Sequence, residues 1–340
     1  MIFVSIDVGR SSVKATAKCG NKTDTLSFPS IFSDSWSTFS DKDNKFVTTS
    51  FRTNKHCFSL DEKYRDEFFP HQVYLFGETA EELGHSPNTF KESDSFHKFS
   101  VYATTYVVAY FCNKFRDYEV SAAVNLTFTN VHAQEFYSKA LKKTFYLRLW
   151  DEGTPLKFTI QELFCFQQGY AAIFNFLNTP QFSELMDTTT LIVDIGKHTS
   201  DLSLVKSFTL VDGTSINIGT SQAIQKIKQY CSSVAELTDF QIEVALQKPS
   251  TFYQSIKGEK ILPSEVAVKY EVFEKVYKDI YSRIIDFVDR QSIHHLYLVG
   301  GGSNMFSKQF EKDFKLPKLP SEGIYSNAKG MLKFITSGVS

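Results

Sequence analysis

The 340-residue chain lacks the sequence features of disulfide-rich, zinc-binding and membrane-spanning proteins. Its five cysteines are scattered, none belongs to a Cys-x-x-Cys pair, and no histidines cluster at the spacing of a metal site. We therefore expect neither a disulfide nor a zinc ion, as is usual in a reducing cytosol. The N-terminus has no basic leader or cleavage site, and the most apolar helical stretch, 101–112, is shorter than a membrane span. These absences predict a soluble, cytoplasmic protein without a membrane partner.

An excess of charge of either sign is also missing. Lysine and arginine number 37, aspartate and glutamate number 38, and the formal net charge is −1. Without a strong electrostatic field, direct binding to nucleic acid is not expected. Aromatic residues are abundant instead, with 33 Phe and 16 Tyr, and we expect most of them to fill the core. The length suits about two domains.

One short motif occurs twice, as FVSIDVGRSS at residues 3–12 and as IVDIGKHTSD at residues 192–201. In each copy an apolar run ends in an aspartate, one apolar residue and a glycine follow, and a polar turn leads back into strand-type residues. This pattern predicts two β-hairpins. Their separation is too large for a solenoid repeat and suits the two halves of a duplicated fold.

Each predicted hairpin contains the parts of a phosphate site. A glycine in the turn lets successive backbone N–H groups converge on a phosphate oxygen. The aspartate places a negative charge beside them, which suits a phosphate that carries Mg²⁺, because this ion is held by one or two carboxylates together with phosphates and water. For one copy alone, ordinary turn chemistry is the alternative. Two facing copies would clamp one magnesium nucleotide.

The two hairpins resemble the phosphate loops of the actin, heat-shock-chaperone and sugar-kinase ATPase superfamily. The resemblance rests on Asp7-x-Gly9 followed by Lys14, and on Asp194-x-Gly196 followed by Thr199 and Asp201. A third stretch, LYLVGGGSN at 296–304, is similar to the adenosine motif of that family. The resemblance implies an α/β, actin-like (ribonuclease H-like) duplicated two-domain fold with a nucleotide cleft between the domains. The implied domains are 1–177, with an insertion at about 30–95, and 178–340, with an insertion at about 220–290.

The resemblance also implies roles for individual residues. Asp7 and Asp194 would hold Mg²⁺, mainly through water, and Asp194 would accept a proton during hydrolysis. Gln168, or alternatively Gln167, would orient the attacking water, because 164–172 lies where the family has its first connecting helix. The implied catalytic residues are thus Asp194, Gln168 and Asp7. The implied nucleotide-binding residues are Asp7, Gly9, Arg10, Ser11, Ser12, Lys14, Gly196, Lys197, His198, Thr199, Gly300, Gly301, Gly302 and Asn304.

Two departures from the family pattern stand out. Lys197 and His198 follow Gly196 where the family usually has glycines, so their Cβ atoms restrict the loop while Lys197 could add charge at the phosphate. Thr127 replaces a proline that follows a similar strand in the plasmid-segregation branch. The preference between ATP and GTP is left open.

Local patterns predict further elements. Aromatic residues spaced by three and four over 96–110 predict a helix with an aromatic face, and an apolar stripe over 264–290 predicts one long helix. Thr238-x-x-Gln241 is a capping box, and 303–314 is expected to be helical. A strand is expected at 46–51. Residues 325–331 resemble the second connecting helix of the family, which implies that Ala328 and Gly330 permit close helix approach.

Three functional classes share such a core. A metabolite kinase would need a substrate pocket with a catalytic aspartate, for which no candidate motif is present, and a chaperone would need a peptide-binding domain, whereas only ten residues follow Gly330. The chain is most similar to the ParM/StbA plasmid-segregation group. That resemblance implies an ATPase, with GTP as the alternative nucleotide, that uses Mg²⁺ and forms filaments, with a DNA-binding adaptor protein on a centromere-like plasmid site as its partner. A non-polymerising ATP-binding adaptor is the alternative.

Overall fold

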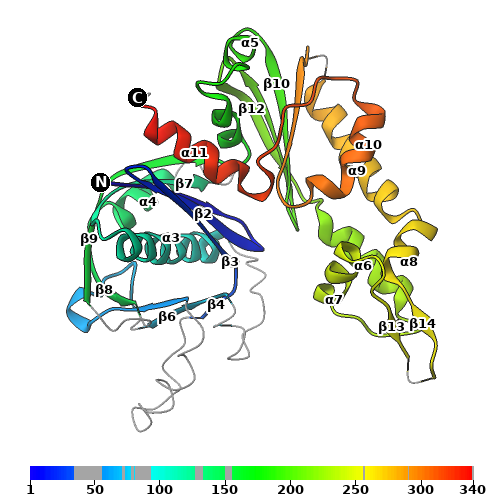
Figure 1. Cartoon of the computed structure of the whole chain (residues 1–340), viewed down its shortest axis with the longest axis horizontal. Helices are drawn as coiled ribbons and strands as arrows, with labels where there is room; N and C mark the ends of the chain where they lie inside the picture. Colours follow the sequence, from blue (N-terminus) through cyan, green and yellow to red (C-terminus); the bar gives the residue numbers. More distant parts are fainter. Residues whose placement is uncertain are drawn as a thin grey trace. The chain divides into compact units, whose positions relative to one another are not determined.

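The computed structural model (Figure 1) describes residues 1–33, 56–70, 73–77, 80, 93–126, 133–149, 155–255, 257–289 and 291–338. The strand predicted at 46–51 lies outside the described residues. The chain forms two compact units, Met1–Phe182 with Ile324–Ser340, and Ser183–Gly323. The first boundary is close to the predicted one, but the C-terminal segment belongs to the first unit, whereas the sequence assigned it to the second.

The first unit is built on a nine-stranded sheet, counted over the described residues, with the order β3-β2-β1-β7-β9-β8-β5-β6-β4. β1, β7 and β9 run parallel, and the other pairs are antiparallel. The strands are β1 Ile2–Val8, β2 Ser12–Cys19, β3 Lys22–Pro29, β4 Phe32–Ser33, β5 Cys57–Ser59, β6 Val73–Phe76, β7 Glu119–Leu126, β8 Thr144–Leu149 and β9 Pro155–Gln167. Strands from the predicted insertion at 30–95 therefore continue the main sheet.

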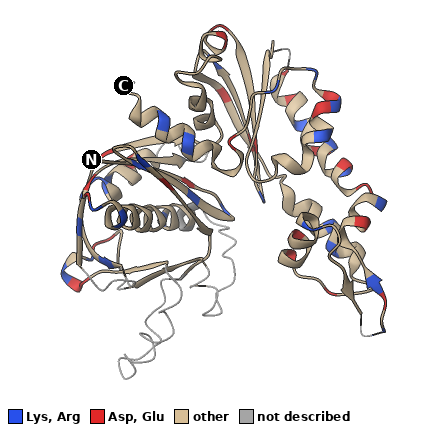
Figure 2. Cartoon of the chain, viewed as in Figure 1, with Lys and Arg blue, Asp and Glu red and all other residues tan. Residues whose placement is uncertain are grey.

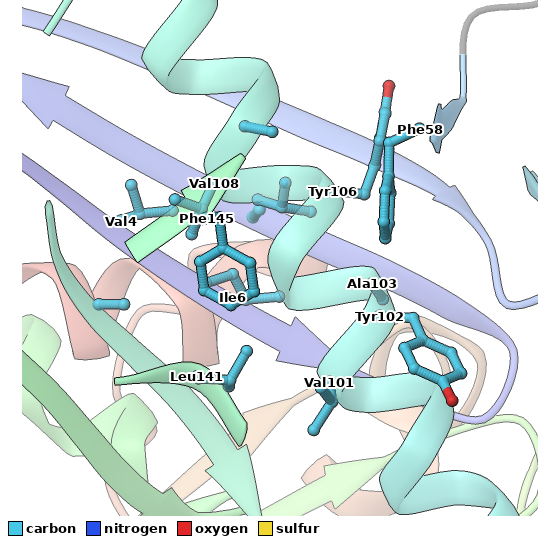
Figure 3. Packing of buried hydrophobic residues seen from close by; sticks show 14 of the residues in the cluster. Val4, Ile6, Phe58, Val101, Tyr102, Ala103, Tyr106, Val108, Leu141 and Phe145 are labelled. Atoms are coloured by element: carbon cyan, nitrogen blue, oxygen red, sulfur yellow. The ribbon is translucent and has the colours of Figure 1, made fainter. Parts of the chain in front are cut away.

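Helix α3 (Ser93–Phe115) lies inside the curl of this sheet, with β1 to β3 on one side and β4 and β6 on the other (Figure 1). The predicted helix with an aromatic face is confirmed, since the buried rings of Tyr102 and Tyr106 contact those of Phe32 on β4 and Phe76 on β6. The rest of this part of the helix is covered as well, because every residue from 101 to 109 is at most 3% exposed. Figure 3 shows its Val108 packed beside Val4 of β1. Buried phenylalanine and tyrosine rings dominate this core, as the composition predicted.

The opposite face of the sheet is covered by helix α11 (Ser326–Thr336), which contacts β1, β2 and β7 and the 3-10 segment η4 (Tyr170–Phe176). A Cβ atom at Gly330 would lie 2.9 Å from the carbonyl carbon of Ala171 and closer still to its oxygen. Gly330 therefore permits the close approach that the sequence predicted. Asn175 of η4 donates a hydrogen bond to the Ser326 carbonyl (2.8 Å) and accepts one from Lys333 (2.8 Å) through its own carbonyl. Helix α4 (Ala133–Leu141) packs beside α3, and η3 is Glu62–Tyr64.

The second unit contains a sheet with the order β12-β11-β10-β15. Its strands are β10 Thr189–Ile195, β11 Ser200–Lys206, β12 Thr209–Ile216 and β15 His295–Val299, and a separate hairpin consists of β13 Tyr253–Gln254 and β14 Lys260–Ile261. This order repeats β3-β2-β1-β7 of the first unit. In both sheets the strand that ends at the motif aspartate pairs antiparallel with the next strand and parallel with a later one. The predicted duplicated α/β fold is confirmed.

The helices of the second unit are α5 Phe182–Met186, α6 Thr220–Cys231, α7 Asp239–Gln247, α8 Pro263–Lys269, α9 Val272–Val288 and α10 Ser303–Asp313, and η5 (Gly323–Tyr325) leads to α11. The helix expected at 303–314 is confirmed. The capping box is also confirmed, since Thr238 Oγ1 accepts from the Gln241 N–H at 3.2 Å and the Thr238 N–H donates to Gln241 Oε1 at 2.8 Å. Figure 2 shows acidic and basic residues interspersed along α9 and α10, as expected from the balanced composition.

The single helix predicted at 264–290 was wrong. The helix is interrupted between α8 and α9, where Glu271 has a φ of +50°. The apolar stripe continues in the new register, with Val276, Ile280 and Ile284 buried. Helix α9 packs on β11, β12 and α10, so this part of the predicted insertion at 220–290 belongs to the sheet core.

Candidate functional site

The first motif forms the predicted hairpin between β1 and β2, with Asp7 paired opposite Lys14. The turn closes through a hydrogen bond from the Gly9 N–H to the Ser12 carbonyl (3.0 Å). Ser30 fixes it from outside, because its hydroxyl donates to the Gly9 carbonyl at 2.6 Å. Arg10 is exposed at the tip, and Ser11 is half-buried. The turn is thus pinned at its base while its tip is accessible.

Asp7 is buried, with 4% of its surface exposed. Asn125 of β7 donates from Nδ2 to its Oδ1 at 2.8 Å and accepts from the Val8 N–H at 2.7 Å, and the Lys14 Nζ lies 3.8 Å from Oδ2. Burial raises the pKa of Asp7 above its ordinary value, opposed by the Lys14 ammonium and by a hydrogen bond with Asn327. Neither asparagine was predicted from the sequence as a partner of Asp7. The signal that could have indicated one of them is a polar residue, Asn125, at the end of an apolar strand.

The second motif repeats this hairpin between β10 and β11. The Gly196 N–H donates to the Thr199 carbonyl at 2.9 Å, which matches the bond in the first turn. Asp194 is again buried, with 5% exposed, but its cross-strand partner is Asp201, also buried, where the first hairpin has Lys14. The backbone is duplicated, and the charge at the paired position is reversed.

The second loop rests on the start of helix α6. The Thr220 N–H donates to the Gly196 carbonyl (3.1 Å) and the Ser221 N–H donates to the Lys197 carbonyl (2.7 Å). A Cβ atom at Gly219 would lie 2.5 Å from the Lys197 carbonyl oxygen, so this close contact requires glycine. Sequence analysis missed this role, although a glycine directly before a helix was visible.

The side chain of Lys197 forms an ion pair with Glu243 of α7, at 2.8 Å from Nζ to Oε1. The positive charge of Lys197, which was expected to lie at a phosphate, is thus paired with a carboxylate of the same unit. Neither Lys197 nor His198 has a positive φ, so the loop accommodates both Cβ atoms in an ordinary backbone conformation. The two Cβ atoms, which were expected to restrict the loop backbone, therefore do not alter the conformation of the turn.

The three-glycine stretch packs directly on the second hairpin. Gly300 has a φ of +83°, and a Cβ atom there would lie 2.6 Å from the Ile195 carbonyl oxygen and closer still to Oδ1 of Asp194. The Gly302 N–H donates to the same Ile195 carbonyl at 2.8 Å. Gly301 and Asn304 are exposed. The structure therefore brings together two motifs that lie about a hundred residues apart in the chain.

Gln168 lies in the turn after β9, before Gly169, which has a φ of +80° and leads into η4. The helix expected over 164–172 was wrong in its first half, because β9 continues to Gln167. The parallel registers place Asp7, Asn125 and Phe166 on adjacent strands at one sheet edge. Gln168 therefore lies at the same edge as Asp7, about 10 Å away at ordinary strand spacing.

Buried carboxylates at the strand ends are the hard oxygen donors that Mg²⁺ prefers. In the part of the chain that the structure describes, no three His, Cys, Asp or Glu side chains lie together as a metal site. Asp7 and Asp194 are each such a carboxylate at the end of a strand, one in each unit.

The comparisons with known proteins agree with this geometry. Residues 192–312, which include the second hairpin and the three glycines, match the family described as archaeal actin homologue MreB-like, C-terminal. Three solved structures are similar over the whole chain. They are the archaeal actin homologue Ta0583 (TM-score 0.75, 18% identity, 100% of both chains covered), ParM in a 15-stranded filament from Clostridium botulinum (0.71, 17%, 99% of both) and Bacillus thuringiensis ParM with ATP (0.68, 15%, 99% of both).

The chain therefore has the actin-like fold, and the resemblance that the two hairpins and the glycine stretch suggested is confirmed. Curated protein sequences give no significant match. Within the described residues, no helix has the length and apolar character needed to cross a membrane.

Proposed function

We propose that the protein is an actin-like nucleoside triphosphatase that binds a magnesium nucleotide and polymerises. The observation that carries this proposal is the duplicated hairpin, in which a buried aspartate precedes a turn closed by the same backbone hydrogen bond, at 3.0 Å and 2.9 Å. The fold adds support, since solved structures with the same fold include Ta0583 with ADP and ParM with ATP.

The residues divide into three roles. Backbone N–H groups of 9–12 and 196–199 would donate to phosphate oxygens, and Lys14 would add a point charge. Asp7 and Asp194 would hold Mg²⁺, which neutralises phosphate charge when bound. Phosphoryl transfer needs mainly positioning and charge neutralisation. Gln168 is neutral and would orient a water, while Asp194 would accept its proton, so we expect slow hydrolysis.

Burial of Asp7 supports this assignment. A carboxyl group whose pKa is raised by desolvation is costly to keep ionised, and a bound cation would stabilise its charged form. Natural proteins retain such costs where function requires them. The described contacts of Asp7 come from two neutral asparagines and one lysine, so its carboxylate can also accept a cationic ligand.

We further propose that the filaments segregate plasmid DNA in the cytoplasm through a DNA-binding adaptor. The support is the ParM filament among the similar structures and the balanced charge, 37 basic against 38 acidic residues, which disfavours direct DNA binding. ATP is the first candidate nucleotide, and GTP is the second.

Right-angle light scattering after addition of Mg-ATP or Mg-GTP tests the proposal, with phosphate release followed in parallel. We expect scattering to rise and then decay as nucleotide is spent, and to persist longer in Asp194→Ala. Asp7→Ala should abolish magnesium-nucleotide binding. The matched control is Asp212→Ala, an exposed aspartate on β12, which should behave like the unaltered protein.

Two other results would redirect the assignment. A flat scattering trace despite tight nucleotide binding would identify a non-polymerising adaptor. Rapid turnover only on addition of a sugar would identify a kinase.

A further inference from the structure

We propose that the ion pair between Lys197 and Glu243, called the clamp below, holds the second phosphate loop (196–199) against α7. In this proposal Glu243 is a positioning residue for the loop, and Lys197 is not a phosphate ligand. The proposal rests on the nucleotide binding proposed above and adds a determinant of affinity outside the phosphate loops. It concerns the two positions at which this chain departs from the glycine-rich family pattern.

Lys197 is held at both ends. Its backbone carbonyl accepts a hydrogen bond from the Ser221 N–H of α6 at 2.7 Å, and its ammonium group lies 2.8 Å from the Glu243 carboxylate of α7. Both charged side chains are 29% exposed, so the pair is partly shielded from water. One residue of the loop is therefore attached to two helices.

These two helices are also attached to each other. Asp239, at the start of α7, accepts from Lys228 Nζ at 3.3 Å and from Gln225 Nε2 at 3.1 Å, and both donors belong to α6. The capping box between Thr238 and Gln241 fixes the first turn of α7, from which Glu243 follows directly. The loop thus rests on a braced helix pair.

The ion pair adds a tertiary constraint to the local one that the Lys197 and His198 Cβ atoms place on the loop. The donors offered to a phosphate are the backbone N–H groups of 196–199, and binding is tighter when such donors are already fixed in place. Loss of the ion pair would free the Lys197 side chain, leave the loop held by its hydrogen bonds to α6 alone, and let those bonds open more often. A phosphate ligand would show the opposite dependence on Glu243, because release of the lysine would favour the phosphate.

Titration of the full chain with Mg-ATP separates these two roles. We expect Lys197→Met and Glu243→Gln each to weaken binding by about threefold, the range of a partly exposed ion pair, and the double variant to be no weaker than either. The charge swap Lys197→Glu with Glu243→Lys should restore affinity to within about twofold. The effect should shrink at high salt.

The matched control is Lys318→Met with Glu311→Gln, which removes another ion pair of the same unit (2.8 Å from Nζ to Oε1) that involves neither the loop nor the two helices that support it. It should leave affinity unchanged. The proposal is overturned if Glu243→Gln tightens binding or leaves it unchanged while Lys197→Met weakens it, or if the charge swap is the weakest variant, since each result would place Lys197 at the phosphate.

Hydrogen exchange without nucleotide provides a second readout. The Thr220 and Ser221 amides, which bond to the loop carbonyls, should exchange faster in Glu243→Gln than in the unaltered protein and no faster in the control. Equal exchange in all variants would contradict the clamp. Failure of the unaltered protein to bind any nucleotide would instead refute the proposed function, while the exchange rates would still decide the clamp.

Discussion

Gly300→Ala is the substitution at the candidate site that we expect to destabilise the protein most. Gly300 has a φ of +83°, where an L-residue costs roughly 1–2 kcal/mol. The new Cβ atom would also lie 2.6 Å from the Ile195 carbonyl oxygen and closer to the Asp194 carboxylate, both of which are buried and held in the sheet. Forced displacement of packed atoms costs about 1–3 kcal/mol. We therefore expect a loss of about 2–5 kcal/mol in the free energy of unfolding.

Gly20→Ala is the matched control, because Gly20 has a φ of +57° and a Cβ atom there meets nothing within 4 Å. It should show the backbone cost alone, roughly 1–2 kcal/mol. The difference between the two variants measures the clash with Ile195 and Asp194.

Urea unfolding followed by far-UV circular dichroism and by tryptophan fluorescence provides the assay. Both tryptophans, Trp36 and Trp150, fall within Met1–Phe182, whereas Gly300 belongs to the other unit. With a slope of about 2 kcal/mol per molar urea, Gly300→Ala should lower the circular dichroism midpoint by about 1–2.5 M. A midpoint lowered no further than that of Gly20→Ala would refute the close contact, and with it the account of why glycine is needed there.

Two further predictions concern the first unit. Gly330→Ala gains about 1 kcal/mol of helix propensity but pushes a Cβ atom into the Ala171 carbonyl, so the melting temperature in differential scanning fluorimetry should fall, and a rise would contradict the close packing of α11 on η4. Asp7→Asn should stabilise the fold increasingly as pH rises through the acidic range above about 4, where the unfolded chain's carboxyl loses its proton. Because the pKa of Asp7 is raised in the native state, the native protein keeps its proton at pH values where the unfolded chain has lost it, and this contribution to stability is lost as pH rises toward the native pKa. Urea midpoints measured across this pH range test it, and a gain that does not grow with pH would refute the desolvated state of Asp7.

The parts of the fold that sequence analysis predicted correctly are those set by local pattern. The two hairpins follow from an apolar run, an aspartate and a glycine, and the capping box at Thr238 needs only four consecutive residues. Gly330 was also recognised, because 325–331 resembles the second connecting helix of the family, in which small residues permit close packing.

The errors arose where tertiary context decides the outcome. An apolar stripe continues through the α8–α9 break, and nothing near Glu271 marks a positive φ, since glutamate has no preference for it. The aromatic face of α3 was predicted correctly, but burial of its other faces depends on strands from distant parts of the chain, which the spacing of the aromatic residues does not show. The contacts of Lys197 with Glu243 and of Asn125 with Asp7 join residues 46 and 118 positions apart, which no local pattern reports.

The duplicated hairpins are equal in backbone and unequal in charge, and this inequality bears on how a nucleotide would be held. Asp7 faces Lys14 across the first hairpin, so that pair is nearly neutral and its lysine can meet phosphate. Asp194 faces Asp201 across the second, where the strand partner is a second carboxylate instead of a lysine. Under the proposed function the two hairpins would therefore contribute different groups: the first has an ammonium group to offer to a phosphate, whereas the second has two carboxylates, the type of ligand that Mg²⁺ prefers.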